Sequence, residues 1–136
     1  MPVTNLFIGS PVDAARTPER LFRALMIEDW AEHDSDNYPQ GSYHLGRGGD
    51  VELTLWADEF AGFEDYPYRL ALSLINDSQF DLEAVTDLAV AELLKGGFSV
   101  ARETGNGTGF VERELYSLSP SGQILKRPDR REVAEE

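Results

Sequence analysis

Residues 50–60, DVELTLWADEF, alternate between apolar and polar side chains, and this alternation sets the fold class. One face of the segment carries Val51, Leu53, Leu55 and Ala57. The other face is polar except for Trp56, so the period of two predicts a β-strand with one buried side. Residues 68–75, YRLALSLI, are apolar on both faces apart from Arg69 and Ser73, which predicts a strand inside the sheet. The short connector between the two segments predicts an antiparallel hairpin.

Two helices are predicted to flank this hairpin along the chain. The first starts at residues 17–19, Thr-Pro-Glu, because threonine can cap free backbone N–H groups and proline suits the first helical position. The spacing of its apolar residues predicts that this helix runs to about His33. The second starts after Ser78 or Asp81 and ends at Lys95, where a cation precedes two glycines.

The remaining sequence predicts short strands and loops around these elements. Residues 34–49 mix acids with turn-forming residues and predict a long loop. Further strands are predicted over residues 3–8, 98–103, 110–118 and 123–126. The order β-α-β-β-α-β-β, with a short last strand, predicts an α+β fold in which two helices pack on one face of a mostly antiparallel sheet. The first six elements match the order of a ferredoxin-like arrangement.

The composition indicates one acidic domain. The chain has 136 residues, no cysteine and a formal charge of −13. We expect a single core over residues 1–126 and a flexible, charged tail over residues 127–136. The negative charge argues against nucleic acid and anionic membranes as partners. No apolar run is long enough to span a membrane and no secretion signal is visible at the N-terminus, so we expect a soluble, cytoplasmic protein.

The negative charge is concentrated in the middle of the chain. Between Ala24 and Leu94 stand 16 acidic residues and only two basic ones, Arg47 and Arg69. Acidic and basic residues nearly balance on either side of this stretch. A concentrated field of one sign steers a partner of the opposite sign, although the same charge can serve simply to keep a small protein in solution.

No group of residues has the spacing of a known metal site. Asp29, His33 and His44 could form a His–carboxylate site, but their spacing matches no zinc or iron signature. Residues 34–37, Asp-Ser-Asp-Asn, begin like a calcium loop, but the glycine and glutamate that such a loop requires are missing. We therefore expect no metal and no cofactor.

Catalytic and phosphate-binding motifs are equally weak. The carboxylate pairs Asp58-Glu59 and Glu64-Asp65 could serve as acid and base only if an apolar pocket raised the pKa of one member. The glycine-rich residues 46–49 and 105–109 lie next to predicted strands, which favours hairpin loops over phosphate-binding loops. We therefore predict no catalytic residue.

Residues 52–68, ELTLWADEFAGFEDYPY, are the most distinctive segment of the chain. Aromatic and acidic residues are interleaved along it, and it contains no lysine or arginine. Trp56 points away from the apolar face of its strand, and aromatic anchors ringed by charge are typical of binding hot spots. The predicted binding residues are Glu52, Trp56, Asp58, Glu59, Phe63, Glu64, Asp65, Tyr66 and Tyr68. In the alternative interpretation a helix covers this face, so that Trp56 belongs to the core and Phe63 closes the end of the hairpin.

These patterns favour a protein-binding module, not an enzyme, that holds and neutralises a basic protein, as inhibitors of toxins or nucleases do. The alternative is a homo-oligomeric assembly subunit of a phage or secretion system, with residues 34–49 and the hairpins in the subunit contacts. A small enzyme that uses paired carboxylates is the third hypothesis. Association with a basic protein that slows steeply as salt rises would distinguish the binding module from the assembly subunit.

Overall fold

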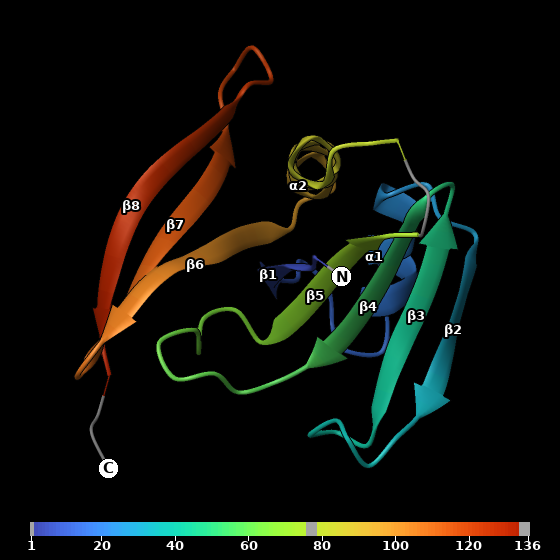
Figure 1. Ribbon diagram of the computed structural model, residues 1–136, viewed down its shortest axis with the longest axis horizontal. Coiled ribbons are helices and arrows are strands. Elements are labelled where there is room, and N and C mark those ends of the chain that lie inside the picture. Colours follow the sequence, from blue (N-terminus) through green and yellow to red (C-terminus); the bar gives the residue numbers. More distant parts are fainter. Residues whose placement is uncertain (1, 76–78, 134–136) are drawn as a thin grey trace.

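An antiparallel sheet of eight strands and two helices make up the computed structural model, which describes residues 2–75 and 79–133 (Figure 1). The elements are β1 (Thr4–Gly9), α1 (Thr17–Ala24), β2 (Asp29–Asp34), β3 (Ser42–Gly48), β4 (Val51–Ala57), β5 (Tyr68–Leu74), α2 (Leu82–Lys95), β6 (Ser99–Gly107), β7 (Phe110–Leu118) and β8 (Ile124–Glu132). The strand order is β2-β3-β4-β5-β1-β6-β7-β8. The α+β class is confirmed, but the predicted element order is wrong, the sheet is larger than predicted, and the ferredoxin-like arrangement does not fit.

The predicted central hairpin corresponds to β4 and β5. Leu53 lies opposite Leu72 and Leu55 lies opposite Leu70, and all four side chains are buried. β1 follows β5 in the sheet, and its residue Leu6 pairs with Leu70. The apolar face predicted from the alternation is therefore the core face of the sheet.

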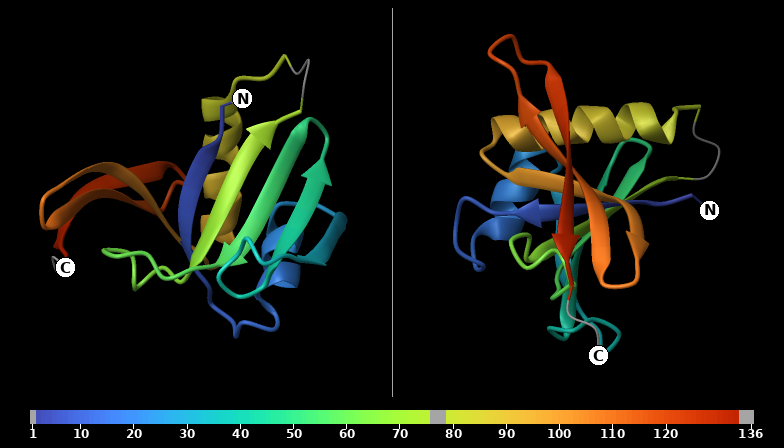
Figure 2. Two further views of the ribbon diagram at one scale, coloured as in Figure 1. Left: turned by 60° about the horizontal axis from the view of Figure 1, so that its bottom comes forward. Right: turned by 90° about the vertical axis from the view of Figure 1, so that its left-hand side faces the viewer.

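Both helices pack against this core face. Leu21 and Phe22 of α1 and Val90 and Leu93 of α2 are fully buried in one cluster with leucines of the central strands. α2 contacts β6 and β7, whereas α1 lies on the side of β3 and β4 (Figure 2). The two helices therefore share one layer without covering the sheet from both sides.

α2 is the element closest to its prediction. Asp81 accepts a hydrogen bond from the Ala84 N–H, and the helix ends at Lys95, which precedes two glycines. Ser78, the alternative start, lies outside the described residues. The N-cap and the terminal cation follow from ordinary helix chemistry, which explains the agreement.

α1 ends at Ala24 rather than near His33, and a strand, β2, follows it. The chain reverses at Met26, whose φ of 57° lies in the left-handed region. Trp30 of β2 then stacks on Phe22 of α1, with 5.2 Å between the ring centroids. The apolar stripe that predicted a longer helix is satisfied by a strand, because Trp30 reaches the core from β2.

β3 lies within the predicted loop of residues 34–49, and two glycines explain how it fits beneath α1. A side chain at Gly46 would overlap the Phe22 ring, and one at Gly48 would press against Ile27. Glycine within a strand often marks such a close approach of another element. Gly46 and Gly48 are therefore strand residues and not the loop residues that were predicted.

β8 takes the place of the predicted flexible tail. Residues 127–132 continue a strand opposite β7, so the prediction is wrong for them, and residues 134–136 lie outside the described part of the chain. The Val133 N–H donates to the Gly109 carbonyl, so odd-numbered residues of β8 direct their backbone groups toward β7. Pro128 consequently faces the open edge, where its missing N–H removes no hydrogen bond from the sheet.

The sheet bends sharply between its two halves. β1 pairs with β5 from Thr4 to Ile8 but with β6 only from Phe7 to Gly9. β6, β7 and β8 turn away from the other strands beyond this point (Figure 2). The loop between β4 and β5 packs on the side opposite the helices, where Phe63 meets Phe7.

Candidate binding face

The sheet face opposite the helices carries Trp56. This side chain is half-buried and lies on the reverse of the strand from the core residue Leu55. Both helices pack on the Leu55 side. The alternative interpretation, in which a helix covers Trp56, is therefore wrong.

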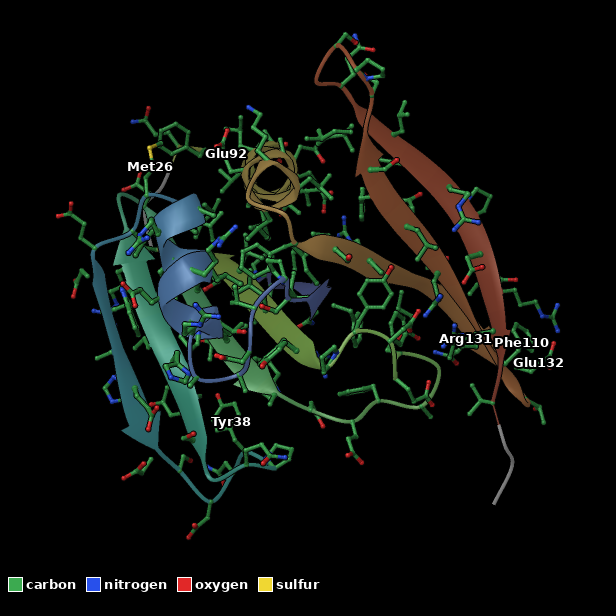
Figure 3. The ribbon with its side chains drawn as sticks, turned by 180° about the vertical axis from the view of Figure 1, so that it is seen from behind. Met26, Tyr38, Glu92, Phe110, Arg131 and Glu132 are labelled. Carbon is green, nitrogen blue, oxygen red and sulfur yellow. The ribbon has the colours of Figure 1, made fainter. Side chains whose placement is uncertain are left out.

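Aromatic side chains continue from Trp56 toward the β2 edge. Tyr38 lies edge-on to Trp56 at 5.3 Å, Tyr43 lies 4.7 Å from Tyr38, and His33 stacks on Tyr43 at 5.2 Å, all between ring centroids. We call these four residues the aromatic row. Figure 3 shows Tyr38 in the turn beyond β2 and β3. The turn is closed by hydrogen bonds across residues 35–41, which fold Tyr38 back onto the sheet.

Arg69 joins the aromatic row to the rest of this face. Its guanidinium carbon lies 4.5 Å from the Phe60 ring centroid and 5.6 Å from those of Trp56 and Phe7. The Nε atom is buried and, among the described residues, has no hydrogen-bond partner. Contacts with three rings therefore hold this cation in place, as electron-rich ring faces attract a guanidinium.

Phe63 belongs to the core and not to a binding surface. Its side chain is 1% exposed and stacks on Phe7 with 3.7 Å between the ring centroids. Phe60 completes the cluster by packing edge-on against Phe7. The predicted binding role of Phe63 is wrong, because the loop turns this ring inward, in keeping with its predicted alternative role at the end of the hairpin.

The carboxylates of Glu64 and Asp65 already bind cations of this chain. Arg113, 3% exposed on β7, donates to Asp65 at 2.8 Å and also to the Gly62 carbonyl at 2.9 Å. Arg131 of β8 adds a second ion pair to Asp65 at 3.3 Å, and it lies 3.9 Å from Glu64. The sequence segment lacks such cations near these acids, but β7 and β8 supply them.

These contacts shift the acidity of both groups. Hydrogen bonds from its own N–H and that of Gly62 lower the pKa of Glu64. For Asp65, burial opposes ionisation, but hydrogen bonds and charge from Arg113 and Arg131 outweigh it, so its pKa is also lowered. Neither carboxyl is thus suited to act as a general acid at neutral pH, which requires a raised pKa.

Tyr66, Tyr68 and Glu52 are also placed away from Trp56 or engaged in other contacts. Tyr66 is half-buried beside the Phe63 cluster, and burial raises its pKa. Tyr68 packs against the main core on the helix side of the sheet. Glu52 forms an ion pair with Arg47 at 3.0 Å.

Asp58 and Glu59 remain at the surface beside Trp56. The Trp56 indole N–H donates to Asp58 at 3.3 Å, which fixes the orientation of the ring. Glu59 is exposed and forms no ion pair with any described residue. Asp34 and Asp36, which precede Tyr38, are likewise exposed and form no ion pair within residues 2–75 and 79–133. Glu59 and Asp36 thus lie within three residues of Trp56 and Tyr38 in the sequence, whereas the alternation of β2 puts Asp34 on the face opposite His33.

Asp29, His33 and His44, the residues considered as metal ligands but not predicted to bind one, are separated in the fold. His44 pairs with Glu32 at 3.0 Å, whereas His33 stacks on Tyr43, and the alternation of the strands puts the two histidines on opposite sheet faces. Asp29 lies opposite Arg47 in the β2–β3 pairing. The part of the chain that the structure describes contains no cluster of three or more residues able to hold a metal ion.

Comparison with known proteins gives no family for this chain: no family model, curated protein or solved structure matches it. None of the helices in the described segments has the length and apolar character needed to cross a membrane.

Trp56, Asp58 and Glu59 are predicted from the sequence and lie on this face, whereas Tyr38 and Tyr43 are not among the predicted residues. Both tyrosines stand in residues predicted as loop, where no periodic pattern marks a face. Only the pairing of β3 with β4 brings Tyr43 toward Trp56, which lies 13 positions away in the sequence. The presence of two tyrosines in one short acidic segment was the only available signal.

Proposed function

We propose that this protein is a binding module whose aromatic row receives a basic segment of another protein in the cytoplasm. The observation that supports this proposal is the half-buried Trp56–Tyr38 pair on a sheet face opposite the helices, next to exposed carboxylates without ion pairs. Aromatic side chains are strongly enriched at the centres of protein interfaces. Charged residues at the rim then select the partner and orient it.

The chemistry of the face favours arginine in the partner. A guanidinium can lie flat on an aromatic ring while it donates hydrogen bonds to a carboxylate. Arg69 already makes the ring contact from within the sheet, at 5.6 Å from Trp56. A partner arginine can approach the solvent side of the same rings and pair with Glu59 or Asp36.

Binding of this kind would neutralise a basic partner. A protein that acts on nucleic acid carries cations where phosphate binds. Carboxylates presented beside aromatic rings compete for those cations and exclude the nucleic acid. An inhibitor or immunity-type role therefore follows from the same geometry.

The other two hypotheses gain less from the structure. Sheet edges that pair between subunits need free backbone groups, but Pro128 interrupts the outer edge of β8 and charged side chains line β2. An enzyme that uses paired carboxylates needs two carboxyl groups that are free to exchange protons with a substrate. Here Asp58 accepts a hydrogen bond from the Trp56 indole, and Asp65 is held by Arg113.

The test uses Trp56 as its own reporter. The chain has two tryptophans, so Trp30→Phe leaves Trp56 as the only indole. Titration with an arginine–glycine repeat peptide is expected to change the Trp56 fluorescence to saturation, with an affinity that falls as salt rises. Asp58→Lys combined with Glu59→Lys is expected to weaken binding at least about tenfold, the effect of replacing attraction by like-charge contact.

The matched control reverses two acids on the other half of the sheet, Glu103→Lys with Glu112→Lys. Both residues are exposed, so the change in net charge is the same. This control is expected to cost much less affinity than the changes at Asp58 and Glu59. Equal losses in the two double variants would show that only the overall charge attracts the peptide, and would contradict the proposal.

A further inference from the structure

The helix layer has a gap between α2 and residues 25–27, which follow α1. The gap is a groove of about 460 Å³ whose floor includes the buried Leu53 and Leu72 of the central hairpin. Its walls are formed by residues 25–27 and by the side of α2 that carries Val85 and Leu88. We call it the helix groove, and it lies on the opposite side of the sheet from the aromatic row.

The two most exposed large apolar side chains of the described residues line this groove. Met26 is 83% exposed and Leu88 is 68% exposed. Figure 3 shows Met26 at the same end of the molecule as Glu92 of α2. Apolar side chains of this size at the rim of a largely aliphatic groove are typical of a binding surface, because a partner that covers them removes apolar area from water.

The backbone at Met26 supports this view. Its φ of 57° is a conformation that glycine adopts more readily than methionine. Methionine is a flexible and polarisable side chain that adapts to irregular apolar partners. The chain thus keeps a large exposed apolar side chain at a position where glycine would fold with less strain.

The charges around the groove favour a cationic partner. Among the described residues that line the groove, Glu92 alone is charged, and it pairs with Lys95. Asp87, next to Leu88, and Glu28, two residues after Met26, are exposed and form no ion pair with the described residues. Two cations nearby already have partners: Arg23 pairs with Glu19, and Lys95 pairs with Glu92. A second copy of this chain, with a charge of −13, would bring repulsion rather than complementarity.

We propose that the helix groove binds an amphipathic helix of a partner protein, with aliphatic side chains toward Leu53 and Leu88 and lysine or arginine near Asp87 and Glu28. A strand cannot extend the sheet at the floor, because β4 is already paired with β3 and β5. Side-chain packing must therefore provide the affinity, which is how amphipathic helices bind apolar grooves. The proposal goes beyond the aromatic row and does not depend on it.

The test measures binding of a fluorescently labelled leucine–lysine peptide with leucines at helical spacing, by anisotropy with the full chain. Leu88→Lys is expected to weaken binding about tenfold or more, the loss expected when one leucine-sized contact is replaced by a charge. Leu125→Lys, at another exposed leucine on β8, is the matched control and is expected to lower affinity much less.

Met26→Gly separates binding from folding. Glycine accepts the φ of 57°, so the melting temperature is expected to stay the same or rise, while peptide affinity falls severalfold. A variant that merely unfolds would instead lose both. Asp58→Lys combined with Glu59→Lys, on the opposite face, is expected to change the affinity for the leucine–lysine peptide no more than Glu103→Lys combined with Glu112→Lys does.

Three results would overturn the proposal. A leucine–glutamate peptide of the same pattern that binds equally well would refute the charge argument. Peptide affinity unchanged by Leu88→Lys would show that the groove is not the site. A dimer in sedimentation velocity that Leu88→Lys dissociates would assign the groove to a second copy of the chain.

Discussion

Arg113 shows how one buried side chain organises a segment that looks like a binding loop in the sequence. It contacts Asp65, Asp129 and the Gly62 carbonyl, and its guanidinium lies 5.4 Å from the Phe63 ring centroid. The loop between β4 and β5 is thereby tied to β7 and β8. Glu64 and Asp65, which have no cation near them in the sequence, are therefore paired in the fold.

Replacing Arg113 by methionine is expected to destabilise the protein by about 3 kcal/mol, because two carboxylates lose their buried partner. Asp65 and Asp129 are partly exposed, so water compensates some of the loss. Urea unfolding of both proteins measures the difference. An unfolding free energy that hardly changes would mean that the stacking of Phe63 on Phe7, and not the ion pairs, holds the loop.

Stability is expected to fall in acid, because the folded state lowers the pKa of Asp65 below its ordinary 3.8 and that of Glu64 below 4.5. The unfolded chain then binds more protons than the folded chain as pH falls through and below these values. The contribution of both groups is complete above pH 5 or so and is lost at lower pH.

Urea midpoints measured between pH 6 and pH 3 test this linkage. Asp65→Asn removes one of the titrating groups, so its midpoint is expected to decline less over that range than that of the parent chain. Parallel declines in the two proteins would show that Asp65 has the same pKa in the folded and unfolded states.

β3, which contacts α1, lies within residues 25–48, where the structure has two strands in place of the predicted helix end and loop. Gly46→Ala places a methyl group against the Phe22 ring and is expected to cost about 1–3 kcal/mol, the usual range for overpacking. Gly105→Ala is the matched control, because the nearest side chain there is that of the exposed Glu112.

Phe22→Leu should reveal the cause of this loss. If the ring is what the new methyl group meets, Gly46→Ala costs less in the Phe22→Leu background than in the parent, because contacting residues are not additive. Equal costs in both backgrounds, measured by thermal or urea unfolding, would place the strain elsewhere.

The elements that the sequence predicted well are those with a local signal. β4 follows from alternation, β5 follows from a run that is apolar on both faces, β7 matches residues 110–118, and α2 follows from the Asp81 cap and the terminal Lys95. Each of these patterns lies entirely within the element. Local chemistry is then sufficient to define it.

β2, β3 and β8 were missed because their stability comes from neighbours. Trp30 fits either a helical stripe or a strand that faces α1, and only packing on Phe22 decides. The sequence of β8 is charged and contains Pro128, so by itself it is typical of a flexible tail. In the fold Asp129 pairs with Arg113 and Arg131 pairs with Asp65. Non-local contacts of this kind leave no periodic trace in the sequence.

At the scale of the whole molecule, some acids of the middle of the chain pair with cations of the same chain and others do not. Glu52, Glu83, Asp65 and Glu92 form ion pairs with arginines or lysine of this chain. The acids near Trp56 form none with the described residues. Of the acids predicted to bind a partner, Glu52, Glu64 and Asp65 therefore pair within the chain, and the binding role of Asp58 and Glu59 stays a prediction.

The indole N–H resonances of Trp56 and Trp30 provide the most direct measurement of the binding proposal. In a two-dimensional ¹H–¹⁵N NMR titration with the arginine–glycine repeat peptide, we expect the Trp56 signal to shift strongly, because its N–H lies against Asp58. The Trp30 signal, stacked on Phe22 on the helix side, is expected to stay in place. A shift at Trp30 with Trp56 unmoved would contradict the account.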